Sequence, residues 1–143
     1  MKFEELKLGM SASTTKAFTE KDVLSFAEVS TDNNPLHIDE EAAKNGMFGQ
    51  RVVHGILVTG LISSVLGTKL PGAGAVYLGQ EVKFRRPVFF NDEITAICEL
   101  IELKEEKHIA IFKTTCVNQH GVEVITGTAT VMVKLETIWK HWI

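Results

Sequence analysis

The apolar residues of this chain follow two different patterns, one in its middle and one in its second half. Residues 52–68 (VVHGILVTGLISSVLGT) carry no titratable side chain except His54, and their apolar positions lie all round rather than along one stripe. A helix of this kind is expected to be buried on every side. The segment is too short and too rich in Gly and Ser for a membrane span, which needs about 20 predominantly apolar residues. From residue 75 onward, apolar and polar residues alternate, which predicts strands.

The remaining elements follow from cap and turn signals. Thr19, with Asp22 three residues later, fits a capping box for a helix that ends near Thr31. Pro35 predicts a turn or extended loop, and Asp39 caps a short helix after it. Strands are expected at 11–18, 75–89 (ended or bent at Pro87), 93–103, 108–117 and 122–135, and a short helix at 39–44. This order predicts an α+β fold in which a curved antiparallel sheet wraps around the central helix.

Composition narrows the class of protein without naming a function. The 143 residues, 45% hydrophobic and 23% charged, suit a single globular domain over 1–143. Residues 136–143 are a possible tail whose two tryptophans either dock or form a disordered end; we favour docking. A net charge of −3 predicts neither a nucleic-acid nor a membrane partner. No signal peptide or membrane span opens the sequence, so a cytoplasmic location is expected by default. Cys98 and Cys116 lack metal-ligand spacing and are expected to be buried thiols.

Asp32 and His37 are the first candidates for chemistry. They flank Asn34-Pro35, in a loop whose shape the proline restricts. A carboxylate and an imidazole held on one rigid turn make an acid–base pair, with room for a water between them. The alternative is a surface turn in which Asp32 caps and His37 is solvated. The position of the loop favours the pair, because it precedes the start of the central helix.

That helix start is the second candidate. The first amides of a helix have no partner inside it and carry the positive end of its dipole. The Gly55 N–H could therefore stabilise an oxyanion, although a glycine needed for close packing is an equal alternative. We assign His54 a structural role. Ser63, about two turns further along, could present its hydroxyl to Asp32 or bond back to its own helix.

Other polar residues carry weaker signals. Lys83, Arg85 and Arg86 form a basic cluster that could bind a nucleotide phosphate, with a solvated strand face as the alternative. His108, His120 and His141 show no zinc-like spacing, and we assign them nothing. No metal and no cofactor is expected.

A known family shares these residues. Asp32-Asn33-Asn34-Pro35-Leu36-His37, with Ala43 following, resembles the D-x-N-P-[LIV]-H signature of the R-specific enoyl-CoA hydratases, MaoC-like dehydratases of the hot-dog fold. Val53-His54-Gly55 is similar to the start of the family's central helix. Further matches are Tyr77-Leu78-Gly79-Gln80, Phe84, Pro87-Val88 and Asp92-Glu93. Thr31 departs from the signature, in which glycine is frequent at this position.

The resemblance implies reversible addition of water to a trans-2-enoyl thioester, giving the (R)-3-hydroxyacyl thioester. It implies that Asp32 and His37 activate the water, that the Gly55 N–H polarises the thioester carbonyl, and that Ser63 and Asn34 support the pair. It also implies a homodimer or a higher homo-oligomer, with an acyl-CoA as the small-molecule substrate. Three alternatives stay open: a 3-hydroxyacyl-acyl-carrier-protein dehydratase, a hot-dog thioesterase, and a non-catalytic module that binds acyl thioesters.

Overall fold

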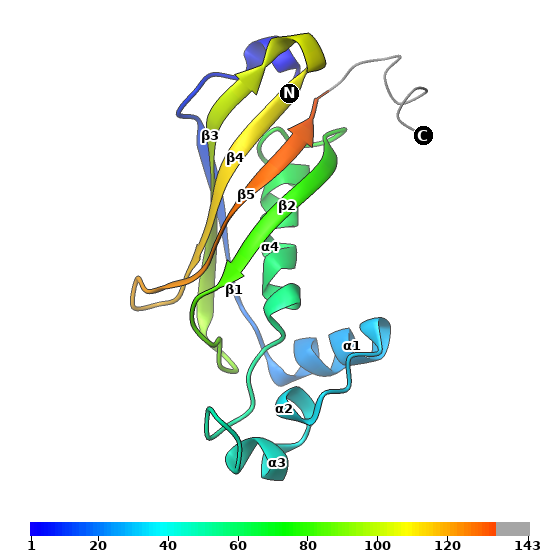
Figure 1. The fold of residues 1–143 in the computed structure, drawn as a ribbon, viewed down its shortest axis with the longest axis vertical. Coiled ribbons are helices and arrows are strands. Elements are labelled where there is room, and N and C mark those ends of the chain that lie inside the picture. The colour runs from blue at the N-terminus through cyan, green and yellow to red at the C-terminus, as the bar shows by residue number, and fades with distance from the viewer. Residues whose placement is uncertain (134–143) are drawn as a thin grey trace.

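A five-stranded antiparallel sheet and one long helix form the body of the protein (Figure 1). In this computed structural model residues 1–133 are described, so the predicted tail at 136–143 lies outside the described residues. The sheet has the order β1-β3-β4-β5-β2. Its strands are β1 (Ser11–Ala17), β2 (Val76–Phe84), β3 (Glu93–Lys104), β4 (Ile109–Val117) and β5 (Glu123–Met132). The helix α4 (Gly55–Thr68) runs along one face of the sheet, which confirms the predicted α+β architecture.

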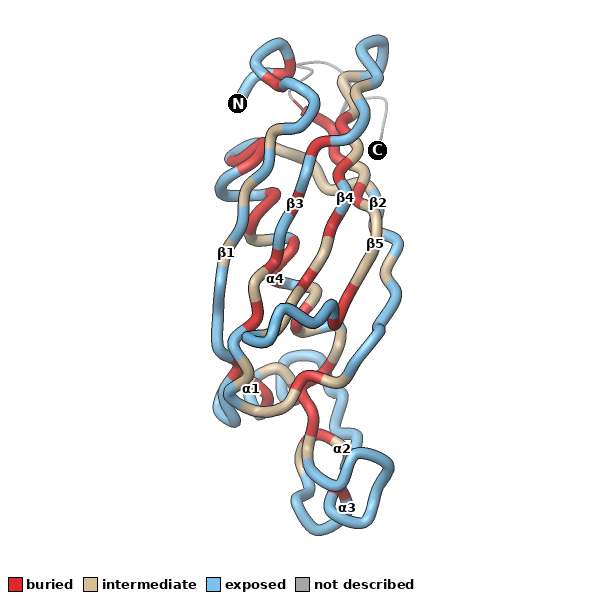
Figure 2. Tube along the Cα trace, turned by 90° about the vertical axis from the view of Figure 1, so that its left-hand side faces the viewer, coloured by how far each residue is buried: buried red, intermediate tan, exposed pale blue. Residues whose placement is uncertain are grey.

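The core lies between α4 and the face of the sheet that it covers. Alternate residues of the central strands point toward the helix and are buried, as the alternating colours along β3 in Figure 2 show. They are Ile94, Ala96, Cys98, Leu100, Ala110, Phe112, Thr114 and Cys116. The helix contributes Val58, Leu61, Ile62, Val65 and Leu66. Both cysteines are buried thiols as predicted, and burial raises the pKa of each to about 12.

One side of α4 is exposed, although the sequence predicted a helix that is buried on every side. Ile56, Gly60, Ser63 and Gly67 are exposed and fall on one stripe at helical spacing. The reason is geometric: a single sheet of five strands covers only one side of the helix. Except for Ile56, the residues on this stripe are small.

The three α-helices that precede α4 lie near its N-terminal end (Figure 1). A short 3-10 helix (Phe3–Glu5) precedes β1, and α1 (Glu20–Ser30) follows it. The predicted capping box is present, because the Thr19 hydroxyl accepts from the Asp22 amide at 3.2 Å and the Asp22 carboxylate accepts from the Thr19 amide at 2.9 Å. Two shorter helices follow, α2 (Pro35–Ile38) and α3 (Glu40–Lys44), and Asp39 caps the second as expected.

Two segments depart from the expected elements. The segment 35–38 was expected to be a turn or extended loop, yet it forms α2, because proline is tolerated at the first position of a helix, where no amide is needed. The strand expected at 75–89 ends at Phe84, and Phe89 beyond Pro87 makes only an isolated bridge with Val52. Among the described residues, no helix is both long enough and apolar enough to cross a membrane.

Candidate active site

Hydrogen bonds within the loop after α1 hold Asp32 in place. The Ser30 hydroxyl donates to the Phe26 carbonyl at 2.6 Å and accepts from the Asp32 amide at 3.1 Å. The Asp32 carboxylate in turn accepts from the Asn34 amide at 3.3 Å. The side chain of Asp32 is exposed, so its second oxygen is open to a water or a ligand.

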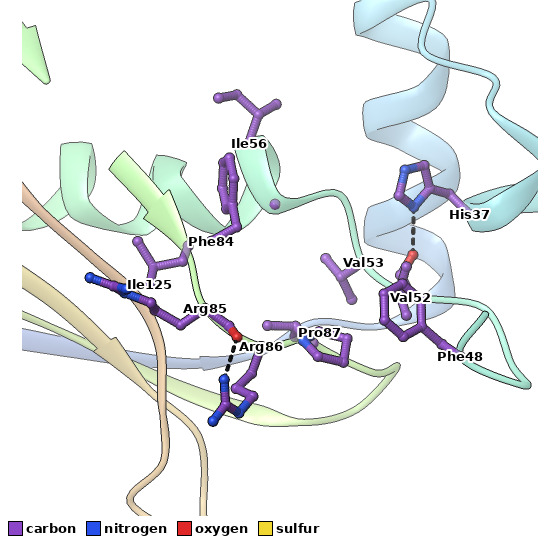
Figure 3. Close-up of a pocket in the computed structure, with 12 residues that line it drawn as sticks. His37, Phe48, Val52, Val53, Ile56, Phe84, Arg85, Arg86, Pro87 and Ile125 are labelled. Atoms are coloured by element: carbon purple, nitrogen blue, oxygen red, sulfur yellow. Dashed lines mark hydrogen bonds between the residues drawn. The ribbon is translucent and has the colours of Figure 1, made fainter. Parts of the chain in front are cut away.

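His37 lies in α2 with only 8% of its surface exposed. Its Nδ1 is 2.7 Å from the Val52 carbonyl oxygen, the contact drawn as a dashed line in Figure 3. A carbonyl oxygen only accepts, so Nδ1 carries the proton in the neutral ring and Nε2 presents a lone pair. A neutral imidazole in this tautomer can take a proton at Nε2.

Asp32, His37 and His54 form one cluster, in which one potential ligand atom from each lies within 4.8 Å of the others. The ring of His54 stacks on the ring of His37, with centroids 3.8 Å apart and an interplanar angle of 27°. Its Nε2 lies 3.1 Å from the Asp32 carbonyl oxygen. One nitrogen of each ring therefore contacts a main-chain carbonyl. His37 Nε2 and the Asp32 carboxylate remain as groups that could hold a water, whereas His54 Nδ1 is buried without a hydrogen-bond partner among residues 1–133.

A cavity of about 390 Å³ opens beside this cluster and reaches the start of α4 (Figure 3). Both His37 and Gly55 line it, whereas Asp32 does not. Most of the wall is apolar, contributed by Phe48, Val52, Val53, Ile56, Phe84, Pro87, Val88 and Ile125. The size and lining are those of a small-molecule site, in which few polar groups orient an apolar ligand.

Gly55 begins α4 directly after its N-cap residue His54. No hydrogen bond joins its amide to another residue within 1–133, so this N–H is available to an oxygen in the cavity. The packing alternative also holds, because a Cβ on Gly55 would lie 2.6 Å from Cδ1 and Cε1 of the Phe84 ring. The absence of a side chain thus serves both the close approach of Phe84 and access to the amide.

Comparison with known proteins identifies the family. The MaoC-like domain family matches residues 4–125. The chain belongs to the MaoC-like dehydratases. It is 47% identical over 131 residues to an (R)-specific enoyl-CoA hydratase of Rhodospirillum rubrum, covering 92% of this chain and 90% of that one. A mitochondrial 3-hydroxyacyl-[acyl-carrier-protein] dehydratase of Arabidopsis thaliana is 41% identical, covering 87% of this chain and 76% of that one.

The solved structures agree with this assignment. The (R)-hydratase from A. caviae superimposes with a TM-score of 0.89 at 41% identity, covering 92% of this chain and 99% of that one. The predicted family and the predicted hot-dog fold are therefore confirmed. The backbone at Thr31 explains why glycine suits this position of the MaoC-like signature. Its φ of +66° lies in the left-handed region, which glycine adopts without strain and threonine does not.

The MaoC-like resemblance implied that Asn34 and Ser63 support Asp32 and His37, and the structure places these two residues at different distances from the pair. The Asn34 side chain accepts from the Leu36 amide at 3.0 Å and so caps α2, the helix that carries His37. Ser63 makes no hydrogen bond to Asp32 within the described chain. It is exposed about 12 Å along α4 from Gly55 and lines a separate cavity of about 80 Å³. Within one chain, Ser63 and Asp32 therefore lie apart, and the support of Asp32 by Ser63 stays a prediction.

The three residues of the basic cluster lie at the end of β2 and just beyond it, and they are placed differently relative to the cavity. Phe84 points toward α4, so the strand alternation places Lys83 on the opposite face, and Lys83 does not line the cavity. Arg85 and Arg86 do line it. The Arg85 Nε donates to the Thr126 hydroxyl at 3.0 Å, and the Arg86 guanidinium donates to the Arg85 carbonyl at 2.8 Å. The two arginines therefore lie at the cavity and Lys83 does not, and a phosphate contact of any of the three stays a prediction.

Proposed function

We propose that this protein is an (R)-specific enoyl-CoA hydratase that adds water reversibly to a trans-2-enoyl-CoA and forms the (R)-3-hydroxyacyl-CoA. The observation that carries the proposal is that His37 and the free Gly55 amide line one apolar cavity, with Asp32 in direct reach of the imidazole cluster. The identity to the hydratase of Rhodospirillum rubrum supports the same reaction.

The proposed chemistry needs only these groups and one water. The Asp32 carboxylate and His37 Nε2 hold the water, and they take one of its protons as its oxygen bonds to C3 of the substrate. The pair then returns a proton to C2, so that the elements of water are added across the double bond. During this step, negative charge develops on the thioester oxygen, and the Gly55 N–H at the positive end of α4 stabilises it. One such preorganised donor is worth about 2.7–4 kcal/mol in other enzymes.

The substrate enters through the rim of the cavity. The apolar wall receives the acyl group, and the guanidinium groups of Arg85 and Arg86 at the rim pair with phosphates of the coenzyme A arm. The proposal requires no redox cofactor, because the addition of water is redox-neutral overall. It includes no metal, since Asp32 and His37 activate the water and the Gly55 amide stabilises the developing charge.

The working unit proposed here is a homodimer. Among the described strands, β2 has a hydrogen-bonded neighbour on one side only, and such an edge invites pairing with another chain. Beside this edge, Ile56 and Phe84 expose 58% and 56% of their surfaces. A second copy that pairs along β2 would cover both. Light scattering tests the dimer, and the mass of one chain in solution would contradict it.

The decisive test of the activity uses crotonyl-CoA and follows the loss of enoyl absorbance. Asp32→Asn and His37→Gln should each abolish hydration while the far-ultraviolet circular dichroism stays unchanged. His120→Gln is the matched control, because His120 is exposed in a turn and far along the chain from the cluster. Full activity in either site variant would refute the mechanism.

A second candidate acts on the same acyl group carried by acyl carrier protein, and the 41% identity to the Arabidopsis dehydratase favours it. The same assay with crotonyl-acyl carrier protein separates the two by their kcat/KM values. A thiol-reactive dye in the assay detects a thioesterase, which would release free coenzyme A. Calorimetric binding of crotonyl-CoA without any product would instead indicate a non-catalytic module.

A further inference from the structure

His54 occupies a place in the site that its structural assignment does not explain. Its ring is 2% exposed and lies between Phe26, at 4.8 Å and an interplanar angle of 67°, and His37, at 3.8 Å and 27°. Its Nε2 contacts the carbonyl oxygen of Asp32 at 3.1 Å. The next peptide in the chain is the Gly55 amide. A single residue thus adjoins all three groups that the proposed reaction uses.

The protonation state of this ring follows from its surroundings. Burial lowers the pKa of His54, and although the hydrogen bond to Asp32 opposes this, burial is the larger effect. The ring is therefore neutral at physiological pH. The Asp32 carbonyl only accepts, so Nε2 must carry the single proton and donate it. Nδ1 then keeps a buried lone pair, and it has no hydrogen-bond partner among residues 1–133.

Packing alone does not explain why a histidine occupies position 54. A phenyl ring of similar shape would fill the same space without leaving a buried nitrogen unpaired, which is a destabilising feature. What the imidazole adds over a phenyl ring is the N–H that holds the Asp32 main chain. That hydrogen bond joins the loop before α2 to the N-cap residue of α4. The stacking of the His54 ring on the His37 ring also fixes the orientation of the His37 ring.

We propose that His54 is a positioning residue, which holds the Asp32 main chain through Nε2–H and the His37 ring by stacking, so that both face the Gly55 amide. This inference rests on the proposed roles of Asp32 and His37. It predicts that His54 acts on the rate of the chemical step and little on substrate affinity, since it does not line the cavity. Small displacements of reacting groups carry large penalties in rate, on the order of 100-fold for about 1 Å.

Two variants separate the positioning role from a packing role. His54→Phe keeps the flat ring and removes the donor, and we expect kcat to fall at least about 10-fold with KM changed less than about twofold and the melting temperature retained. His54→Gln places an N–H near the position of Nε2 but loses the ring that stacks on His37, so kcat should recover only in part, to a value between those of His54→Phe and wild type. A His54→Phe enzyme with wild-type kcat would overturn the proposal. So would a loss of kcat that follows the loss of folded protein in both variants.

Nuclear magnetic resonance of the unaltered protein provides an independent test. Labelling the five histidines with ¹⁵N and recording long-range nitrogen–proton correlations reports the tautomer of each ring. We expect His54 to be neutral and protonated at Nε2, and a ring protonated at Nδ1 would overturn the proposal. Asp32→Asn, assayed alongside, keeps the two hypotheses apart. If Asp32→Asn is inactive and His54→Phe is fully active, only the positioning role fails; if Asp32→Asn is fully active, the proposed function itself fails.

Discussion

The sharpest test of the helix start is Gly55→Ala, because the structure fixes where the added methyl group goes. The new Cβ would lie 2.6 Å from two carbons of the Phe84 ring. Carbon atoms in contact prefer about 3.5–4.0 Å, so the ring must retreat by about 1 Å. Phe84 is 56% exposed, so the ring can swing outward while the backbone of β2 stays in place.

The expected effects on stability and on activity differ in size. Overpacking of this kind costs about 1–3 kcal/mol, and the movable ring places Gly55→Ala in the lower half of that range. For a chain of this length, about 1–2 kcal/mol lowers the melting temperature by about 2–8 °C. The methyl group also enters the cavity beside the amide that is proposed to bind the thioester oxygen. Alanine keeps the amide N–H, but its methyl group stands in the way of the thioester oxygen, and losing the contact with one such donor lowers kcat by about 100-fold or more.

A matched control lies on the same helix. A Cβ on Gly60 would meet no atom within 4 Å, so Gly60→Ala gains helix propensity and should stabilise the protein by about 0.5–1 kcal/mol with no loss of activity. Adding Phe84→Ala to Gly55→Ala removes the clash and should restore the melting temperature, while activity stays low. Thermal melts and crotonyl-CoA hydration measure both quantities. Wild-type kcat/KM in Gly55→Ala would refute the reasoning that a side chain at this position keeps the substrate from the amide.

Three further predictions concern stability. Thr31→Gly relieves a left-handed backbone conformation (φ +66°) that costs threonine about 1–2 kcal/mol. The free energy of unfolding measured in urea should therefore rise by up to about 1 kcal/mol, and a fall would contradict the strain. Gly127→Ala would place a Cβ 1.9 Å from the Glu81 carbonyl oxygen. This oxygen belongs to the backbone and cannot swing away, so the free energy of unfolding measured in urea should fall by about 3 kcal/mol or more. Burial lowers the pKa of His54 in the native protein below its ordinary value of 6.5. When the pH falls below 6.5, this histidine therefore takes up a proton in the unfolded chain more readily than in the native protein. The free energy of unfolding should therefore be insensitive to this group above that pH and fall by up to about 1.4 kcal/mol per pH unit below it. Melts between about pH 7.5 and pH 5.5 should show a smaller drop in His54→Phe than in wild type.

Much of the fold was predictable because its signals are local. The Thr19 capping box, the helix start at Gly55 and the alternation in the later strands each depend on residues a few positions apart, and all appear in the structure. The ends of elements were predicted less well. Pro35 was expected to prevent a helix and instead begins α2, since the effect of proline depends on its position within the helix.

The candidate site was predictable only in part, since its parts are assembled by packing. The spacing of Asp32 and His37 indicated a pair on one short segment, but not that the Val52 carbonyl would set the tautomer of His37. No sequence pattern indicated that His54 would stack on that ring. A histidine one residue before a predicted helix start, and close in sequence to an acid–base pair, is the signal that would have suggested it.

The sequence by itself determined the elements, the family and the residue types able to carry proton transfer, because neighbouring residues in the chain specify periodicity, caps and motifs. Tertiary structure alone decided which side chains meet. The sheet covers one side of α4 and leaves Ser63 exposed, Arg86 lines the cavity whereas Lys83 does not, and the packing of β2 beside α4 brings Phe84 against Gly55. These contacts join residues far apart in the chain, and they depend on how a twisted sheet and a helix fit together, which no local pattern encodes.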